Sequence, residues 1–172
     1  MRDILSVLMM IFIFGCLGQK NKKATAIIYS RSGSSITGKA MFKEEAGTVR
    51  IEAEIMGAGT GPLAIHIHSI GDCSSDDGKS SGGHWNPTGE PHGKWGEPPF
   101  HSGDLGNLQV DKNGKGKIVL VDQFGRWSIG GSPKTDIIGK AIIIHAGMDD
   151  MESQPSGAAG ARIGCGVIKK KD

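Results

Sequence analysis

The chain has 172 residues, of which 37% are hydrophobic and 22% charged, and its formal net charge is +2. These values describe one soluble globular domain, large enough for a hydrophobic core of its own, and give no sign of a nucleic-acid-binding surface. The sequence contains no internal repeat, heptad pattern or P-loop, which excludes repeat proteins, coiled coils and P-loop nucleotide-binding proteins.

The N-terminal residues form a segment separate from the domain. An apolar run from Ile4 to Phe14 follows Met1-Arg2-Asp3. This run is too short for a transmembrane helix, which needs about 20 residues, but it has the length of a signal-peptide core. We therefore expect residues 1–15 to be a signal peptide and the protein to be secreted.

The apolar run ends in Ile13-Phe14-Gly15-Cys16, which resembles the lipobox of bacterial lipoproteins. In that motif, cleavage leaves a lipid-modified cysteine as the first mature residue. Cys16 is then the lipidation site, and residues 16–23 form a polar tether between a membrane and the domain. An ordinary signal peptide is the alternative, because Phe14 is an unusual residue beside the cleavage glycine.

From Ala24 onward the pattern is that of β-strands. Over residues 49–55, apolar and charged residues alternate with period two, as in an antiparallel sheet with one buried face. Asp111-Lys112-Asn113-Gly114 predicts a hairpin turn between strands at residues 108–110 and 117–121. Further strands are expected at residues 24–30, 35–43, 63–68, 140–145 and 164–169. Together they predict an all-β sandwich or barrel for the domain, residues 24–172.

The segment from residue 62 to residue 104 holds five of the six histidines. Beyond its first strand it has no helical or strand period and is rich in Gly, Pro, Ser and Asp. Because loops of this length in compact domains are usually functional or disordered, we interpret it as a functional loop. Its histidines are His66, His68, His84, His92 and His101.

Two of these histidines lie on a predicted strand. His66 and His68 are two residues apart, so both side chains project from the same face and can chelate one metal ion. The sixth histidine, His145, ends the predicted strand at residues 140–145. A lone histidine at a strand end is more often a surface or hydrogen-bonded residue than a ligand, but the other histidines favour a ligand role here.

The remaining candidates follow the spacing H-x7-H-x8-H-x2-D and comprise His84, His92, His101 and Asp104. Three imidazole nitrogens and one carboxylate suit a tetrahedral Zn²⁺ site without any thiolate. The alternative is a polar loop with incidental histidines, which is the weaker explanation because every histidine of the chain falls into one of two groups.

These motifs resemble those of the copper-zinc superoxide dismutases, in particular the bacterial periplasmic kind. The matching motifs are His66-Ile67-His68, Gly82-Gly83-His84, His92 with His101-Ser102-Gly103-Asp104-Leu105, Ile144-His145-Ala146-Gly147, and residues 160–168. Together they span residues 24–168. The resemblance implies an eight-stranded antiparallel Greek-key barrel with long metal-binding and active-site loops.

The resemblance also implies one copper and one zinc ion per subunit. It makes His66, His68, His84 and His145 the copper ligands, and His84, His92, His101 and Asp104 the zinc ligands. His84 is then shared between the metals as an imidazolate. Such an enzyme converts superoxide to dioxygen and hydrogen peroxide at a redox-cycling copper, while the zinc is structural. Arg162 matches the active-site arginine, whose positive charge attracts and orients superoxide.

Further roles follow from the same resemblance. Asp149 matches the carboxylate that links copper ligand His66 with zinc ligand His92, and Asp150 is the alternative acceptor. Cys73 and Cys165 match the family's disulfide. This bridge would close a loop of about 90 residues, worth on the order of 4–5 kcal/mol in the chain-entropy model.

Location and partners are expected from the N-terminal segment and the family together. They imply a periplasmic or cell-envelope enzyme, held at a membrane by its lipid, that protects the envelope against superoxide. The lysines at both ends of the domain are expected to be solvated tails or to contact anionic lipid, with no nucleic-acid partner. Family dimers use different surfaces in different branches, so the sequence leaves a homodimer open.

Two other functions also stay open on the sequence alone. One is a non-catalytic metal-binding or copper-handling domain, and the other is a lipid-anchored interaction protein that merely retains the fold. The full set of copper ligands together with Arg162 favours the enzyme.

Overall fold

The computed structural model describes residues 21–171. The expected signal peptide over residues 1–15 and the lipidation site Cys16 lie outside this part of the chain. Among the residues described, no helix combines the length and apolar character that crossing a bilayer requires.

Residues 21–171 form nine strands and one short 3₁₀ helix, η1 (Lys79–Ser81). The strands are β1 (Lys22–Ser30), β2 (Thr37–Glu45), β3 (Thr48–Met56), β4 (Gly61–His68), β5 (Asp104–Val110), β6 (Gly116–Val121), β7 (Ala141–His145), β8 (Arg162–Val167) and β9 (Lys169–Lys171).

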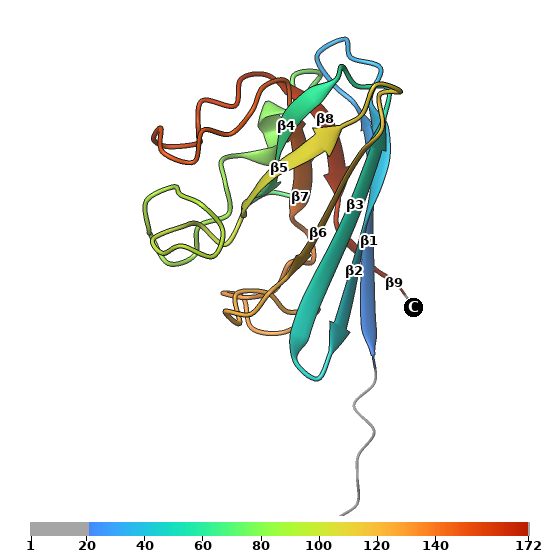
Figure 1. The fold of residues 1–172 in the computed structure, drawn as a ribbon. Coiled ribbons are helices and arrows are strands. Elements are labelled where there is room, and N and C mark those ends of the chain that lie inside the picture. The colour runs from blue at the N-terminus through green and yellow to red at the C-terminus, as the bar shows by residue number, and fades with distance from the viewer. Residues whose placement is uncertain (1–20, 172) are drawn as a thin grey trace, which may run out of the picture.

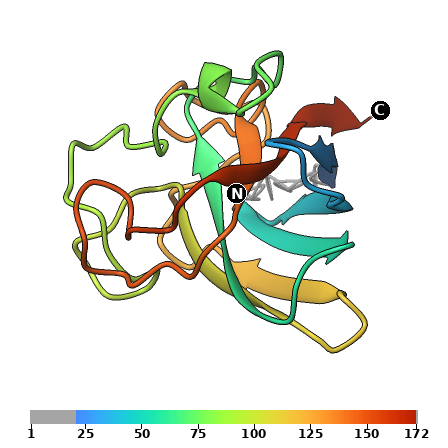
Figure 2. The ribbon, with the colours of Figure 1, turned by 90° about the horizontal axis from the view of Figure 1, so that it is seen from above.

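The strands close into an antiparallel barrel (Figures 1 and 2). Their order is β2-β3-β6-β5-β4-β7-β8-β1, and pairing of β1 with β2 joins the two ends. β9 continues the path of β8 along β1, so the barrel has eight strand positions. The connection from β3 to β4 passes over β6 and β5, which is a Greek-key arrangement. The expected eight-stranded barrel is confirmed.

Alternation along β3 shows how the barrel core is built. Val49, Ile51, Ala53 and Ile55 are buried against the other strands, and the charged residues between them face outward. Inward-facing apolar side chains of the other strands complete one hydrophobic core. The alternating sequence pattern therefore predicted this strand correctly.

β4 and β7 differ from β3 because both of their faces are buried. Every residue of β7 is buried, and so is every residue of β4 from Leu63 onward. The loops between β4 and β5 and between β7 and β8 cover their outer side (Figure 1). Histidines on these two strands are therefore shielded from bulk water.

The predicted hairpin turn lies between β5 and β6, as expected. Asp111 Oδ1 accepts hydrogen bonds from the backbone N–H groups of Asn113 (2.8 Å) and Lys115 (3.0 Å). Gly114 adopts φ = 74°, a conformation that favours glycine. β5 begins at Asp104, earlier than the expected residue 108. The sequence did not reveal this start because the first three residues of the strand are all buried and so show no alternation.

Both ends of the domain differ from expectation. β1 begins at Lys22, so Lys22 and Lys23 of the expected tether belong to the barrel, where Lys22 Nζ pairs with Glu44 Oε1 at 2.9 Å. The C-terminal lysines, expected either as a solvated tail or in contact with anionic lipid, form β9. Backbone pairing with β1 orders Lys169–Lys171 while their side chains stay exposed.

Candidate metal centre

Two adjoining clusters of ligand atoms lie under the loops beside β4 and β7. The first, called here the four-histidine cluster, comprises His66, His68, His84 and His145. One ring nitrogen from each of these residues lies within 4.8 Å of the others. β4 supplies two of the four side chains, the end of β7 supplies His145, and the loop after β4 returns to place His84 beside His68.

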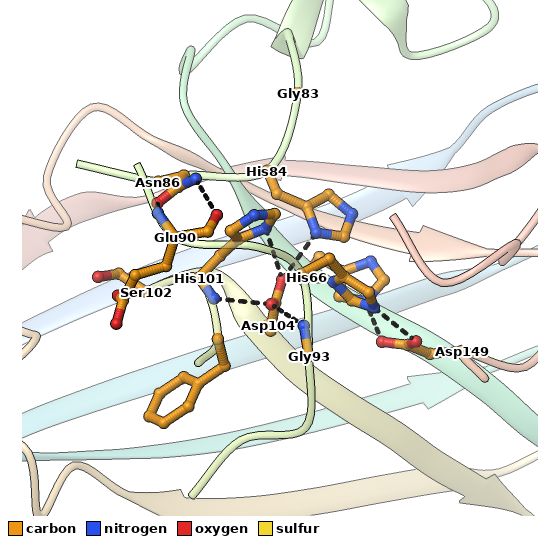
Figure 3. A network of polar contacts seen from close by, with 12 residues as sticks. His66, Gly83, His84, Asn86, Glu90, Gly93, His101, Ser102, Asp104 and Asp149 are labelled. Carbon is orange, nitrogen blue, oxygen red and sulfur yellow. Dashed lines mark hydrogen bonds and ion pairs between the residues drawn. The ribbon is translucent and has the colours of Figure 1, made fainter. Parts of the chain in front are cut away.

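The second, called here the aspartate cluster, comprises His84, His92, His101 and Asp104. Asp104 Oδ1 lies 2.8 Å from His84 Nδ1, 3.0 Å from His92 Nδ1 and 3.1 Å from His101 Nδ1. Its Oδ2 accepts backbone N–H bonds from His101 (2.8 Å) and Gly93 (3.1 Å). Figure 3 shows Asp104 at the centre of these contacts. The backbone thus holds this carboxylate in place among three imidazoles.

His84 belongs to both clusters. Its Nδ1 lies 2.8 Å from Asp104 Oδ1, and its buried Nε2 has no hydrogen-bond partner within residues 21–171. Its ring centroid lies 3.9 Å from the ring centroid of His66 in the four-histidine cluster. The four-histidine cluster and the aspartate cluster therefore share one ring.

The residues present fit two metal ions. Four buried ring nitrogens have no hydrogen-bond partner among residues 21–171: His66 Nδ1, His68 Nε2, His84 Nε2 and His145 Nε2. Nδ1 of His92 and Nδ1 of His101 instead lie 3.0 Å and 3.1 Å from Asp104 Oδ1. Leaving a buried polar atom unpaired costs about 1–3 kcal/mol. A metal ion removes that cost, because each nitrogen then donates its lone pair. Four imidazoles suit Cu²⁺, and three imidazoles with a carboxylate suit Zn²⁺.

The opposite ring nitrogens are held by fixed acceptors. Asp149 Oδ2 lies 2.8 Å from His66 Nε2, and its Oδ1 lies 2.9 Å from His92 Nε2. One carboxylate therefore links the two clusters. Asp150, the alternative acceptor, instead caps the exposed turn that follows it by accepting N–H bonds from Glu152 and Ser153.

Backbone carbonyls hold the two remaining histidines of the four-histidine cluster. His68 Nδ1 donates to Gly82 O at 2.8 Å, and His145 Nδ1 donates to Gly160 O at 3.2 Å. A proton on Nδ1 leaves Nε2 of each ring as the lone-pair donor, which is the form that binds a metal.

Burial sets the protonation of the four-histidine cluster. Burial and neighbouring His84 lower the pKa of His68 to about 2, and burial and neighbouring His66 lower the pKa of His145 to about 3. Burial outweighs Asp104 and lowers the pKa of His84 to about 4. These three rings are neutral at neutral pH and available as ligands.

Carboxylates dominate the aspartate cluster. Burial alone would lower the pKa of His92, but hydrogen bonds and charges from Asp104 and Asp149 raise it to about 9. Burial opposes ionisation of both carboxyl groups, yet the surrounding histidines hold the pKa of Asp104 and of Asp149 well below the usual range. Without a metal, the cluster therefore retains a proton on His92.

Arg162 stands beside the four-histidine cluster. It is the first residue of β8 and pairs across the sheet with His145. Its Nη1 donates to Gly78 O (3.0 Å) and to Ser81 Oγ (3.2 Å), so the loop around η1 holds the guanidinium in place. Burial is the main cause of the low pKa of His68 and of His145, and the nearby positive charge of Arg162 acts in the same direction.

A disulfide fastens the metal loop to the barrel. Cys73 and Cys165 are bonded, with 92 residues of sequence separation and a Cα–Cα distance of 5.8 Å. Cys165 lies on β8, three residues after Arg162. The expected disulfide is confirmed, and it ties the segment before η1 to the strand that carries the arginine.

Several residues that support the site carried no signal in the sequence. Asn107 on β5 binds both backbone groups of Asp149, with its Oδ1 accepting from N (2.8 Å) and its Nδ2 donating to O (2.9 Å). Gln154 likewise binds both backbone groups of His92: its Oε1 accepts from N and its Nε2 donates to O, each at 2.9 Å. These contacts span 42 and 62 residues, and no local motif marks either amide.

The comparisons with known proteins agree with this site. Residues 36–168 match the family model of copper/zinc superoxide dismutase (SODC). Superoxide dismutase [Cu-Zn] 1 of Aquifex aeolicus (strain VF5) is 34% identical over 151 residues, covering 86% of this chain and 88% of the relative. Superoxide dismutase [Cu-Zn] of Paramecium bursaria Chlorella virus 1 is 39% identical over 140 residues, covering 77% and 72%.

A solved structure agrees as well. The clock protein EA4 matches with a TM-score of 0.75 and 34% sequence identity, covering 86% of this chain and 93% of that chain. The family match spans most of the residues that form the barrel. It also includes all seven residues of the two clusters, which share His84. The chain belongs to the copper/zinc superoxide dismutase family and is a superoxide dismutase with copper and zinc as its cofactors.

Proposed function

We propose that the four-histidine cluster holds copper, that the aspartate cluster holds zinc, and that His84 joins the two as an imidazolate. The observation that carries this assignment is the convergence of two sets of buried ligand atoms. Four ring nitrogens without a hydrogen-bond partner within residues 21–171 meet in the four-histidine cluster, and three imidazoles meet on Asp104 in the aspartate cluster. When bound, copper supplies one-electron redox chemistry, and zinc, which has no redox chemistry, supplies positive charge and holds the loop.

His84 has the central part in this proposal. Its Nδ1 lies 2.8 Å from Asp104 Oδ1, and its Nε2 has no partner among the described residues. The ring can serve both clusters only after both nitrogens have lost their protons. Nε2 is then the atom that can take up a proton during turnover and release it to product.

Arg162 binds and orients the substrate. Superoxide is a small anion, and the guanidinium lies beside the four-histidine cluster with Nη1 held by Gly78 and Ser81. Because the loop fixes this charge in advance, little reorganisation is needed when the anion enters. The disulfide at Cys73 supports the same loop.

We further propose that the protein acts in the periplasm and protects the cell envelope. The supporting features are the apolar run ending at Phe14, the lipobox-like Cys16, and a disulfide of a kind that persists in oxidising compartments. Mass spectrometry of the mature protein tests this: an acylated N-terminal Cys16 is expected. A mature chain that retains residues 1–15 would contradict it.

Metal loading and turnover test the catalytic assignment. With one copper and one zinc per chain, Arg162→Ala should keep both metals, measured by elemental analysis, and slow superoxide loss tenfold or more. Arg50→Ala is the matched control, because it removes the same charge from an exposed position on β3. Equal loss of activity in both variants would overturn the proposal. So would an unsubstituted protein that binds one copper and one zinc but does not remove superoxide.

A further inference from the structure

One side of the barrel carries most of the large apolar side chains that are exposed on residues 21–171. We call this surface the outer wall; it consists of the outward-facing residues of β9, β1, β2, β3 and β6. Of nine large hydrophobic side chains exposed on residues 21–171, six lie on it, with exposed fractions of 39% to 59%. They are Ile27, Tyr29, Met41, Met56, Val119 and Val121.

Strand register places these side chains on one continuous surface. Ile27 pairs with Lys39, Met41 pairs with Glu52, and Glu52 in turn pairs with Val119 on β6. Directly opposed residues of neighbouring strands project from the same face of a sheet. A shallow groove along this face is lined by Ile27, Met41 and the stems of nearby lysines.

The outer wall is also basic. It carries seven basic and three acidic side chains: Lys23, Lys39, Lys43, Arg50, Lys117, Lys169 and Lys171 against Glu45, Glu52 and Glu54.

The acids of the outer wall are already neutralised within it. Lys43 pairs with Glu45, Arg50 with Glu52, and Lys117 with both Glu52 and Glu54. Four lysines of the outer wall have no ion-pair partner within residues 21–171: Lys23, Lys39, Lys169 and Lys171. The wall therefore carries an excess of four positive charges.

Apolar side chains among unpaired lysines fit the interface of an anionic bilayer. At such an interface, apolar groups enter the headgroup region, lysine stems lie along apolar surface, and the ammonium groups meet lipid phosphates. A second copy of this chain fits less well, because the same unpaired lysines would face each other. The charge of the wall thus selects an anionic partner.

The direction of the chain agrees with this choice. β1, whose outward-facing residues belong to the outer wall, begins at Lys22, so the proposed lipid site precedes this strand in the sequence. A single acyl chain gives only reversible membrane binding, and stable anchoring takes a second signal such as a basic patch. The wall provides such a patch, starting on the strand that follows the proposed anchor in the sequence.

We propose that the outer wall docks on the surface of an anionic phospholipid bilayer. The loops that carry the metal clusters project from the opposite side of the barrel, as both views in Figures 1 and 2 show. Docking therefore leaves the site and Arg162 facing away from the bilayer and open to superoxide. The inference rests on the proposed membrane anchoring for the protein's presence at the membrane, but the orientation is a property of the wall.

Lysine footprinting of the full mature chain on vesicles tests this orientation. The protein is attached to vesicles of neutral lipid or of neutral lipid with phosphatidylglycerol, and the acetylation rate of each lysine is measured by mass spectrometry. We expect Lys23, Lys39, Lys43 and Lys171 to react at least fivefold more slowly on the anionic vesicles. In 1 M salt the protection should vanish, because the Debye length falls to about 3 Å.

Charge-reversal variants complete the test. Lys39→Glu with Lys171→Glu should abolish the protection of Lys23 and Lys43. The control, Lys79→Glu with Lys134→Glu, reverses the same number of charges in η1 and in the loop between β6 and β7, and should leave the protection unchanged.

Each outcome bears on a different proposal. Failure to sediment with any vesicle would contradict the anchor, whereas attachment without selective protection would overturn the docking. Protection that appears without vesicles and grows with protein concentration would also overturn it, because it identifies a second copy as the occupant.

Discussion

Two buried carboxylates organise the histidines of both clusters. Asp104 accepts two backbone N–H bonds through Oδ2 and directs Oδ1 at three imidazoles. Asp149 uses one oxygen for His66 and the other for His92. Each therefore fixes several ring orientations at once, and a change at either should affect more than one ligand.

Asp149→Asn should weaken both metal sites. The asparagine amide can accept from only one of His66 and His92 and must present an N–H group to the other. Outer hydrogen bonds of this kind typically change metal affinity by about 10–100-fold. Competitive chelator titration should show weaker binding of copper and of zinc. Asp150→Asn is the control, since Asp150 only caps an exposed turn; an equal effect of both substitutions would refute the link.

Metal uptake should release protons unequally. In the metal-free protein His92 has a pKa of about 9, above its ordinary value, so its proton stabilises the fold below pH 6.5 and this contribution is lost as the pH rises through 9. Zinc must displace that proton near pH 7.5. His68 and His145, with pKa values of about 2 and about 3, have none to lose there.

Calorimetry in buffers of different ionisation enthalpy measures this difference. Zinc binding should release about one proton from His92 at pH 7.5 and almost none above pH 10, with affinity rising about tenfold per pH unit below pH 9 and levelling off above it. A proton count for zinc that does not change between pH 7.5 and 10 would show that His92 is not protonated in the metal-free site.

At the scale of elements, strands β4 and β7 and the loops that cover them position the clusters in different ways. β4 and β7 set His66, His68 and His145, whereas the loop residues depend on Asn107, Gln154 and the disulfide. Gly157 shows how tightly the loop between β7 and β8 fits. A Cβ at this position would lie 1.9 Å from Asp149 Oδ1 and 2.7 Å from His92 Nε2.

Gly157→Ala should therefore displace Asp149 and reduce zinc affinity at least tenfold. Gly125→Ala is a matched control, because Gly125 has nearly the same φ (67° against 68°) but no atom within 4 Å of an added Cβ. Both variants should lose about 1–2 kcal/mol of stability from backbone strain, measured by urea denaturation. Only Gly157→Ala should lose metal affinity; unchanged zinc binding in this variant would contradict the contact.

At the scale of the whole molecule, the barrel and the metal site are largely separate. The hydrophobic core lies inside the barrel and β1–β2 pairing closes it, while the ligands gather outside β4 and β7. Metal binding stabilises only the conformation that presents all ligands together. The loops over the clusters should therefore depend on metal far more than the strands do.

Hydrogen exchange after metal removal should show this division. Amides of β1, β2, β3 and β6 should keep their protection, whereas residues 69–103 and 146–161 should exchange at least tenfold faster. Adding zinc without copper should restore the protection of amides around His92 and His101 but not that of the segment beside Arg162. Equal loss of protection in β3 would mean that the barrel itself needs the metals.

The sequence predicted those elements whose signal is local. β3 could be predicted because one of its faces is buried and the other is exposed to solvent. The β5–β6 turn could be predicted because the Asp111 side chain accepts backbone hydrogen bonds and Gly114 adopts a positive φ. The start of β5 was missed because its residues are buried on both faces, which removes the alternation.

The ligand residues could be named from spacing, because chelation restricts residue type and position together. His66 and His68 share a strand face by period alone, and the family motifs supplied the distant His145, Arg162 and the cysteine pair. Amino-acid sequence by itself thus determined the fold class, the strands with alternating burial and the side chains that gather in the two clusters.

Only the tertiary structure decided which groups hold those side chains. Nothing local distinguishes Asp149 from Asp150, yet one is buried between His66 and His92 and the other caps an exposed turn. The supporting amides of Asn107 and Gln154, and the basic outer wall, also arise only when distant strands and loops are brought together. Hydrogen bonds and charge depend on distances in space, and a closed barrel sets those distances between residues far apart in the chain.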